Sequence, residues 1–257
     1  MGSNRIFIAF ITIIIKEISR FLRIWGQTIL PPAVSMTLYF IIFGSLIGPR
    51  IGSMNGFVYM EFIAPGLIMM SVINNSYSNV VASFFGAKFQ RHIEEMLIAP
   101  IPDFIILAGY VLGGVARGIL VGLVVTVVAL FFTDLHIHNY LIVISVVILT
   151  AVLFSLGGFI NAVFARTFDD ISIIPTFVLT PLIYLGGVFY SIDMLPEFWQ
   201  LISKINPILY MVDAFRYGIL GISDINIVFA FSIIFVFIGL LGTWALVLLK
   251  RGTGVKS

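Results

Sequence analysis

The chain has 257 residues, of which 60% are hydrophobic and 10% are charged, and its formal net charge is +2. An average soluble domain carries roughly 25% charged residues, and even a fold of about 300 residues leaves about a quarter of its chain surface in water. These values exclude a soluble fold, so lipid is the expected solvent. The absence of cysteine excludes a disulfide scaffold. No basic run is present, so nucleic acid is not an expected partner.

Residues 4–25 form the first predicted helix, whose apolar part is too short to cross a bilayer. We expect an amphipathic helix in the headgroup plane, with its basic face toward anionic lipid. A seventh crossing is the alternative, and it would bury several charges at a cost of several kcal/mol. The polar residues fall on one face at helical spacing: Thr12, Lys16, Ser19, Arg20 and Arg23.

Six later stretches each supply the roughly 20 apolar residues that a membrane-spanning helix needs. The predicted fold class is therefore an all-α polytopic membrane protein in a single transmembrane domain. The third stretch carries a four-residue glycine repeat, for which we favour packing within the chain over a dimer seam. The fifth contains two prolines and should be kinked. The stretches are 28–48, 62–85, 105–132, 140–164, 172–190 and 226–249.

The basic residues predict the orientation, because six crossings place both termini on one side and the side richer in lysine and arginine is cytoplasmic. We expect both termini in the cytoplasm. Three basic residues fall on the outer side, namely Arg50, Lys204 and Arg216. Ten fall on the inner side: Arg5, Lys16, Arg20, Arg23, Lys88, Arg91, Arg166, Lys250, Arg251 and Lys256.

Arg117 is the one ionisable residue inside the six stretches. It can reach the membrane interface, pair with Asp169 or Asp170, or hold an anionic headgroup, and we favour structural pairing. A proton relay needs a series of membrane acids that this sequence lacks. Energy for transport is therefore expected from outside the chain.

Motifs of common enzymes are missing from the sequence. No GxxxxGK[ST] is present, so the chain cannot bind ATP through a P-loop. HExxH and GxSxG are also absent. His136 and His138 share a short outer loop with Asp134, and a solvated loop is favoured over a metal site there. We expect no catalytic residue, no metal and no cofactor in this chain.

Polar residues gather in the middle of the second stretch. Because exposing them to lipid is costly, they should face protein or a cavity. Packing between helices and contact with a substrate are equally favoured. The candidate substrate-pathway residues, including two aromatic residues of the first stretch, are Tyr39, Phe40, Asn74, Asn75, Tyr77 and Asn79.

The inner connector at 88–100 predicts a short amphipathic helix below the membrane, of the kind that can dock into a groove on a soluble partner. Its candidate docking residues are Arg91, Glu94, Glu95, Met96, Leu97, Ala99 and Pro100.

The outer connector at 191–222 is too apolar for a free loop, and its two helical pieces are too short to span. We expect a re-entrant hairpin in the outer leaflet, acting as a plug or as a gate. Asp213 and Arg216 are three residues apart and should pair at the surface of the second piece. The candidate hairpin residues are Asn206, Pro207, Tyr210, Asp213 and Arg216.

Two of these patterns together resemble the ABC-2 type exporter permeases of bacterial inner membranes. One is Arg91-x-x-Glu94-Glu95-Met-Leu-x-Ala-Pro100, which is similar to the family's coupling helix. The other is Asn206-Pro207-x-x-Tyr210-x-x-x-x-Phe215-Arg216, which resembles its second hallmark. The order of elements agrees over essentially the whole chain.

The resemblance implies a homodimer in the inner membrane, driven by two copies of a separate ATPase that binds ATP and magnesium. It implies export of an amphipathic or lipid-like substrate, such as a lipid, a lipid-linked glycan or a hydrophobic drug. The alternatives are an intramembrane lipid-modifying enzyme and an ion-coupled secondary transporter. The first is weak because Asp169–Asp170 is the only adjacent acidic pair near a membrane end, and the second because membrane acids are missing.

Overall fold

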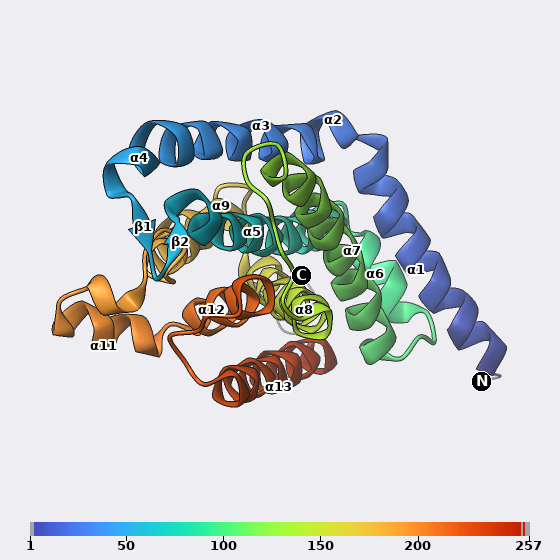
Figure 1. Ribbon diagram of the computed structural model, residues 1–257. Coiled ribbons are helices and arrows are strands. Elements are labelled where there is room, and N and C mark those ends of the chain that lie inside the picture. The colour runs from blue at the N-terminus through green and yellow to red at the C-terminus, as the bar shows by residue number, and fades with distance from the viewer. Residues whose placement is uncertain (1–2, 253, 255–257) are drawn as a thin grey trace.

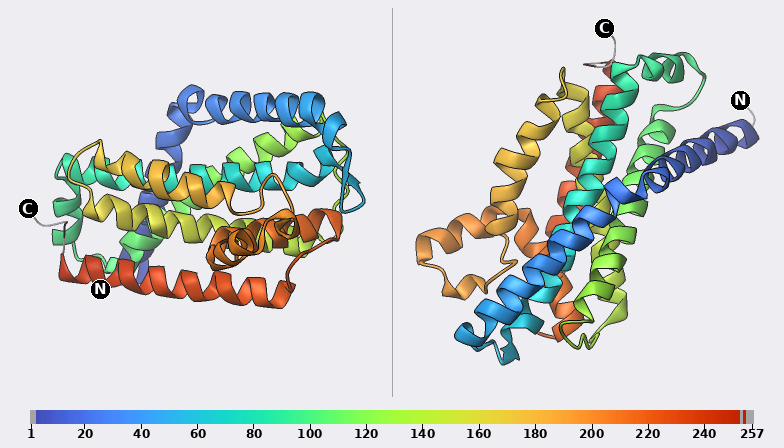
Figure 2. Two further views of the ribbon diagram at one scale, coloured as in Figure 1. Left: turned by 90° about the vertical axis from the view of Figure 1, so that its left-hand side faces the viewer. Right: turned by 90° about the horizontal axis from the view of Figure 1, so that it is seen from above.

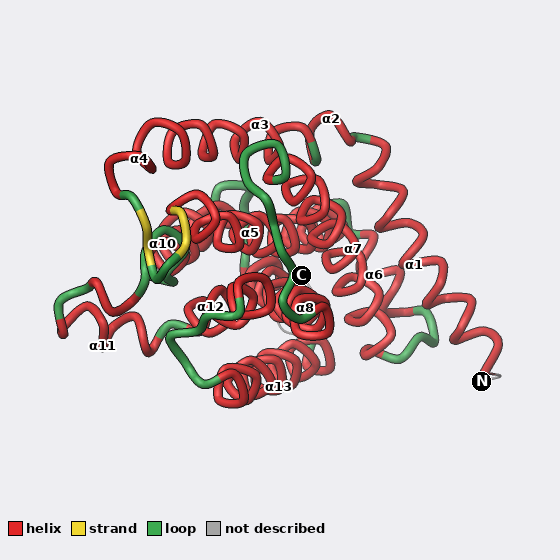
Figure 3. The backbone as a smooth tube through the Cα atoms, in the orientation of Figure 1, coloured by secondary structure: helices red, strands yellow, loops and turns green. Residues whose placement is uncertain are grey.

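The computed structural model describes residues 3–252 and residue 254 (Figure 1). Helices dominate the described residues (Figure 3). The α-helices are α1 (Ser3–Arg23), α2 (Trp25–Thr28), α3 (Leu30–Tyr39), α4 (Gly48–Ile51), α5 (Tyr59–Phe89), α6 (His92–Ile98), α7 (Asp103–Ala129), α8 (Tyr140–Phe164), α9 (Asp170–Ile174), α10 (Thr180–Tyr184), α11 (Glu197–Ile205), α12 (Pro207–Leu220) and α13 (Ile227–Arg251). The other elements are the π-helical segments η1 (Phe40–Ile47) and η2 (Pro175–Leu179), the 3₁₀ turn η3 (Ile192–Met194), and the strands β1 (Ser53–Met54) and β2 (Phe57–Val58).

Helix α5 is the centre of the bundle. It packs along α7 and α8 and also contacts α12, while α13 packs on α8 (Figure 2). Helix α1 packs against α7 and joins α3 through a bend at α2. Helix α6 lies at the end of the bundle where α13 also ends. The helices that carry the predicted sites are therefore held by one central element.

Four helical segments among the described residues are long and apolar enough to cross a membrane: Trp25–Ile51, α7, α8 and α13. Helix α5 is ~46 Å long at 1.5 Å per residue, but its asparagines and serines lower its hydropathy. The helical stretch 170–184 is ~22 Å long, which is less than the ~30 Å hydrocarbon core. Length and composition thus support four of the six predicted crossings.

The segment predicted as one helix at 172–190 is interrupted. Pro175 begins the π-helical segment η2, and the helix ends at Tyr184. Gly187 then has φ +71°, a conformation that favours glycine. A π-helical segment thus begins at one of the two prolines for which a kink is predicted, and the helix stops six residues before the predicted boundary.

A β-hairpin, which the sequence reading missed, joins α4 to α5. Strands β1 and β2 pair antiparallel, with Ser53 opposite Val58 and Met54 opposite Phe57. Asn55 (φ 50°) and Gly56 (φ 86°) form the turn, as expected for the Asn-Gly pair of a tight hairpin. The hairpin fixes the start of α5.

Glycines allow α7 and α8 to approach α5 closely. A Cβ atom on Gly114 would lie 2.3–2.9 Å from Ser155, Val80 and Ser76, and one on Gly158 would lie 2.5 Å from the Tyr77 carbonyl oxygen. The glycine repeat of α7 therefore packs within the chain, as favoured from the sequence.

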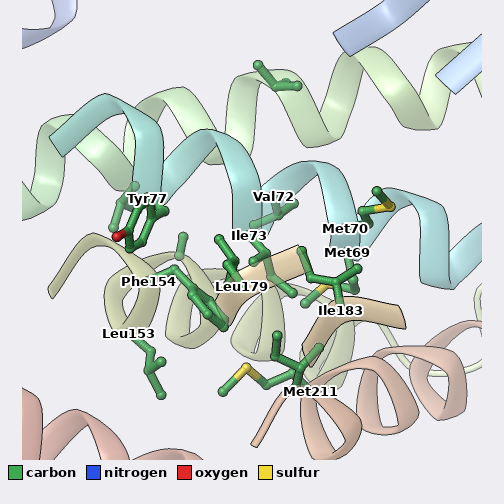
Figure 4. Packing of buried hydrophobic residues seen from close by; sticks show 14 of the residues in the cluster. Met69, Met70, Val72, Ile73, Tyr77, Leu153, Phe154, Leu179, Ile183 and Met211 are labelled. Atoms are coloured by element: carbon green, nitrogen blue, oxygen red, sulfur yellow. The ribbon is translucent and has the colours of Figure 1, made fainter. Parts of the chain in front are cut away.

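The core is formed where α5, α8, η2, α10 and α12 meet (Figure 4). Met69 and Ile73 of α5 lie near Leu179 and Ile183, and Met211 of α12 belongs to the same cluster. Outside this core, many large apolar side chains are exposed, among them Phe131, Phe177 and Val228. Such a surface fits lipid rather than water.

Candidate functional site

Helix α6 is fastened to the bundle by its apolar side. Arg91 precedes it in a left-handed conformation with φ 61°, which turns the chain sharply at the end of α5. Ile93 is fully buried, and the Tyr110 hydroxyl donates to Met96 Sδ at 3.9 Å. Glu95 is exposed. Helix α6 is thus anchored on its apolar side, and its exposed side carries charge and is accessible to a partner.

The remaining predicted docking residues surround this face. Arg91 and Pro100 are exposed, and Glu94 and Ala99 are half-buried. The Leu97 side chain lies outside the part of the chain that the structure describes.

Lys88, in the last turn of α5 shortly before α6, ties α5 to the end of α8. Its Nζ donates to the carbonyl oxygens of Val163 at 2.6 Å and Ala165 at 2.7 Å, which are orphan acceptors at the end of α8. Burial, and after it the nearby Arg166, lower the pKa of Lys88. This contact links the end of α5, after which α6 follows, to the end of α8.

The outer hairpin is built around its Asn-Pro joint. Asn206 caps α12 by accepting from Ile208 N at 3.0 Å, and its Nδ2 donates to Leu182 O at 2.6 Å. Pro207 is the first residue of α12, where proline is favoured. The Tyr210 hydroxyl donates to Lys204 O at 2.6 Å, which joins the two pieces of the hairpin.

The predicted surface ion pair between Asp213 and Arg216 is wrong, because both side chains are buried and bind other groups. Asp213 accepts from the hydroxyl of Ser223 at 2.5 Å and from the backbone N–H groups of the two residues after Ser223. Arg216 donates to Gly187 O at 2.5 Å and lies 4.0 Å above the Phe62 ring. Asp213 therefore fixes the turn into α13, and Arg216 fastens α12 to α5.

The six candidate pathway residues point in different directions within one chain. Asn75 and Asn79 face arginines of α7 and α1, respectively. The Tyr77 ring lies against Gly157 of α8, and half-buried Asn74 lies one residue before Asn75.

The two aromatic candidates of the first span also separate. Tyr39 stacks on Phe43, and its hydroxyl lies 3.3 Å from that of Tyr184. Phe40 is fully buried and stacks on Phe132. Tyr39 is the partly accessible member of this pair.

Two charged residues of α1 contact protein, whereas the other polar residues of the predicted basic face, Thr12, Lys16, Ser19 and Arg23, are exposed. Glu17 is fully buried and accepts from Ser83 Oγ at 2.6 Å. Arg20 donates to Asn79 Oδ1 at 2.8 Å. The apolar side chains of Leu22 and Trp25 are exposed instead. The sequence carries a signal for the burial of Glu17. It lies four residues from both Ile13 and Phe21, and this spacing puts it on an apolar face of the helix.

Arg117 does not pair with Asp169 or Asp170. Its Nη2 donates to Asn75 Oδ1 at 3.1 Å and to Thr28 O at 3.5 Å. Asp170 instead accepts from the backbone N–H groups of Arg166 and Thr167. Structural pairing was the favoured interpretation, but the partner is an amide rather than a carboxylate.

Two cavities lie near the predicted outer side. An apolar one of about 420 Å³ lies between α7 and α8 and is lined by residues such as Leu123, Val147 and Phe215. A smaller one of about 250 Å³ includes His136 and His138. Among the described residues, no three His, Cys, Asp or Glu side chains are grouped so as to hold a metal.

A helical bundle with several membrane-length apolar helices, an end helix fit for docking and a buried polar centre defines a polytopic membrane protein. The family of ABC-2 type transporters matches residues 8–220, and the chain belongs to that family. It is therefore a member of a transporter family rather than an enzyme family.

Relatives of the chain agree with this assignment. It is 61% identical over 242 residues to the inner membrane transport permease YadH of Escherichia coli K12, covering 94% of each chain, and the Shigella flexneri YadH gives the same values. It is 25% identical over 202 residues to nodulation protein J of Rhizobium leguminosarum bv. viciae, covering 78% of each chain.

Proposed function

We propose that this chain is the permease subunit of an ABC-2 type exporter in the bacterial inner membrane. It would cross the membrane six times with both termini in the cytoplasm, and form a homodimer with two copies of a separate ATPase that binds ATP and magnesium. The transported molecule would be amphipathic or lipid-like. Family membership and the printed names of the relatives support this proposal.

The anchored, charged helix α6 is the observation that carries the proposal. Its buried Ile93 and its contact with Tyr110 of α7 allow a push on α6 to reach the bundle. Lys88, in the last turn of α5 shortly before α6, holds this end of α5 to the end of α8. A docking helix without such links could bind a motor but could not pass its motion on.

The pathway and gate roles are part of the same proposal. Tyr39 and Tyr184 would offer aromatic and hydroxyl groups to a substrate at the side of the bundle. The hairpin residues Asn206 and Pro207 would hold the outer end closed at rest, since the joint is bonded to Leu182 O at the end of α10.

Charge reversal on α6 tests the proposal. Glu94→Lys with Glu95→Lys should uncouple ATP hydrolysis from transport or release the ATPase, while the permease stays folded and inserted. The measurements are co-purification of the ATPase and ATP-driven transport in proteoliposomes. The matched control is Glu197→Lys, an exposed acid at the start of α11. Normal coupling in the double variant would show that α6 is not the coupling element.

A further inference from the structure

Two arginines from different helices are held side by side on α5. Arg20 of α1 donates through Nη2 to Asn79 Oδ1 at 2.8 Å and to Asn79 O at 3.1 Å. Arg117 of α7 donates through Nη2 to Asn75 Oδ1 at 3.1 Å. Because Asn75 and Asn79 are one helical turn apart on one face of α5, the two guanidinium groups are neighbours.

The junction of α1, α5 and α7 around Arg20, Arg117, Asn75 and Asn79, called the seam below, has more positive than negative charge. Glu17 is its carboxylate, and it is shared between Ser83 Oγ at 2.6 Å, Arg20 at 3.5 Å and Lys16 at 4.0 Å. Within the described part of the chain, Arg117 has no carboxylate at ion-pair distance. Three cations therefore face one anion, and Glu17 alone does not balance them.

The seam also has unused hydrogen-bond donors. Arg20 Nε, Arg117 Nε and Asn79 Nδ2 are enclosed and have no acceptor among the described residues. The Nη1 groups of the two arginines also donate to no protein atom there, but they are not enclosed. The two open Nη1 groups are the donors that an incoming group can reach. A phosphate fits them, because it brings negative charge and several acceptor oxygens.

Exposed apolar side chains lie on one side of the seam, near the bend between α1 and α3. Arg117 also reaches Thr28 O, which lies at the bend between α1 and α3. Trp25 and Leu30, on either side of Thr28, are 61% and 52% exposed, and Leu22 is exposed as well. An anion arriving here from the bilayer would bring acyl chains that fit this apolar surface.

We propose that Arg20 and Arg117 bind the phosphate of a membrane phospholipid, with its acyl chains along the exposed side of α1–α3. This lipid would fasten α1 to α5 and α7. The inference requires only that the chain lies in a bilayer and is independent of transport and of the ATPase.

Native mass spectrometry of the full chain in detergent tests this site with lipids of equal acyl length. Phosphatidylglycerol should bind and diacylglycerol, which lacks the phosphate, should not compete. Arg117→Gln should weaken phosphatidylglycerol binding at least about tenfold, the effect of losing one charged hydrogen bond. Arg50→Gln is the matched control, because Arg50 is exposed in the last turn of α4.

Three results would overturn the proposal. Equal binding of phosphatidylglycerol and diacylglycerol would exclude recognition of the phosphate, and this comparison needs no variant if Arg117→Gln fails to fold. Unchanged lipid binding in folded Arg117→Gln would exclude the assigned arginine. Equal thermal protection by inorganic phosphate and by phosphatidylglycerol would indicate a small-anion site and not a lipid site.

Discussion

Helices α5 and α13 are both long enough to cross a bilayer, and their surroundings are opposite. Twenty-four of the 31 residues of α5 are buried, although it contains the run of asparagines and serines. Only five of the 25 residues of α13 are buried, although nearly all of them are apolar. The more polar helix is at the centre, and the more apolar helix is at the edge.

The contrast follows from the solvent. In a bilayer an apolar side chain gains little by leaving lipid, so hydrophobicity alone does not bring a helix to the centre. Polar groups exposed to hydrocarbon are costly and are satisfied only by other helices. Asn75 and Asn79 of α5 meet arginines of α7 and α1 for this reason. Polarity within a long helix therefore identifies the central one, whereas hydropathy alone does not separate α13 from α8, which is as apolar but more buried.

The largest expected effect comes from adding a methyl group to two glycines. One lies where α8 packs on the central helix α5, and the other lies on α13 at the edge. Gly158→Ala places a Cβ 2.5 Å from the Tyr77 carbonyl of α5, a backbone atom that cannot rotate away. Gly239→Ala on α13 meets nothing within 4 Å. We expect Gly158→Ala to lose about 1–3 kcal/mol of stability and Gly239→Ala to gain up to about 1 kcal/mol.

Thermal melting followed by size-exclusion chromatography in detergent measures both glycine variants. Equal melting temperatures would mean that α5 and α8 are not in close contact, and the comparison would fail.

A polar substitution tests the role of the buried amides. Asn75→Leu removes the side-chain acceptor of Arg117 and should cost about 1–3 kcal/mol, because a charged donor loses its partner. Thr243→Val on exposed α13 removes a hydroxyl that donates to the Gly239 carbonyl in its own helix, and should change stability by no more than about 0.5 kcal/mol. Chemical unfolding in mixed micelles compares them. A larger loss of stability in Thr243→Val than in Asn75→Leu would contradict the placement of α5 at the centre and α13 at the edge.

The outer hairpin repeats the contrast on a smaller scale, since α12 is mostly buried and α11 mostly exposed. Pro207→Ala at their joint should cost about 0.4–1 kcal/mol through lost preorganisation. If the joint is also a gate, transport or substrate-stimulated ATPase activity should change while assembly survives. Pro196→Ala, before exposed α11, is the control. Normal transport in Pro207→Ala would exclude the gate role and leave the hairpin only the role of a plug.

The sequence predicts local features of this protein better than contacts between distant residues. Apolar length places α8 at 140–164, and Pro175 marks the interrupted helix, because both depend on neighbouring residues. The partners of Arg117 and Arg216 depend on packing among three helices, so spacing along the chain suggested carboxylates where the structure has an amide and carbonyls. The docking residues of α6 could be proposed because they form one short motif.

Site-specific crosslinking tests the docking role of α6 most directly, since the native chain has no cysteine. A single cysteine at Glu95 and another at Gln200 in the outer hairpin would each carry a short photocrosslinker, in the complex purified from native membranes. If α6 is the docking helix, we expect an adduct with an ABC ATPase from position 95 and none from position 200. An intact complex that gives no ATPase adduct from position 95, or gives one from position 200, would contradict it.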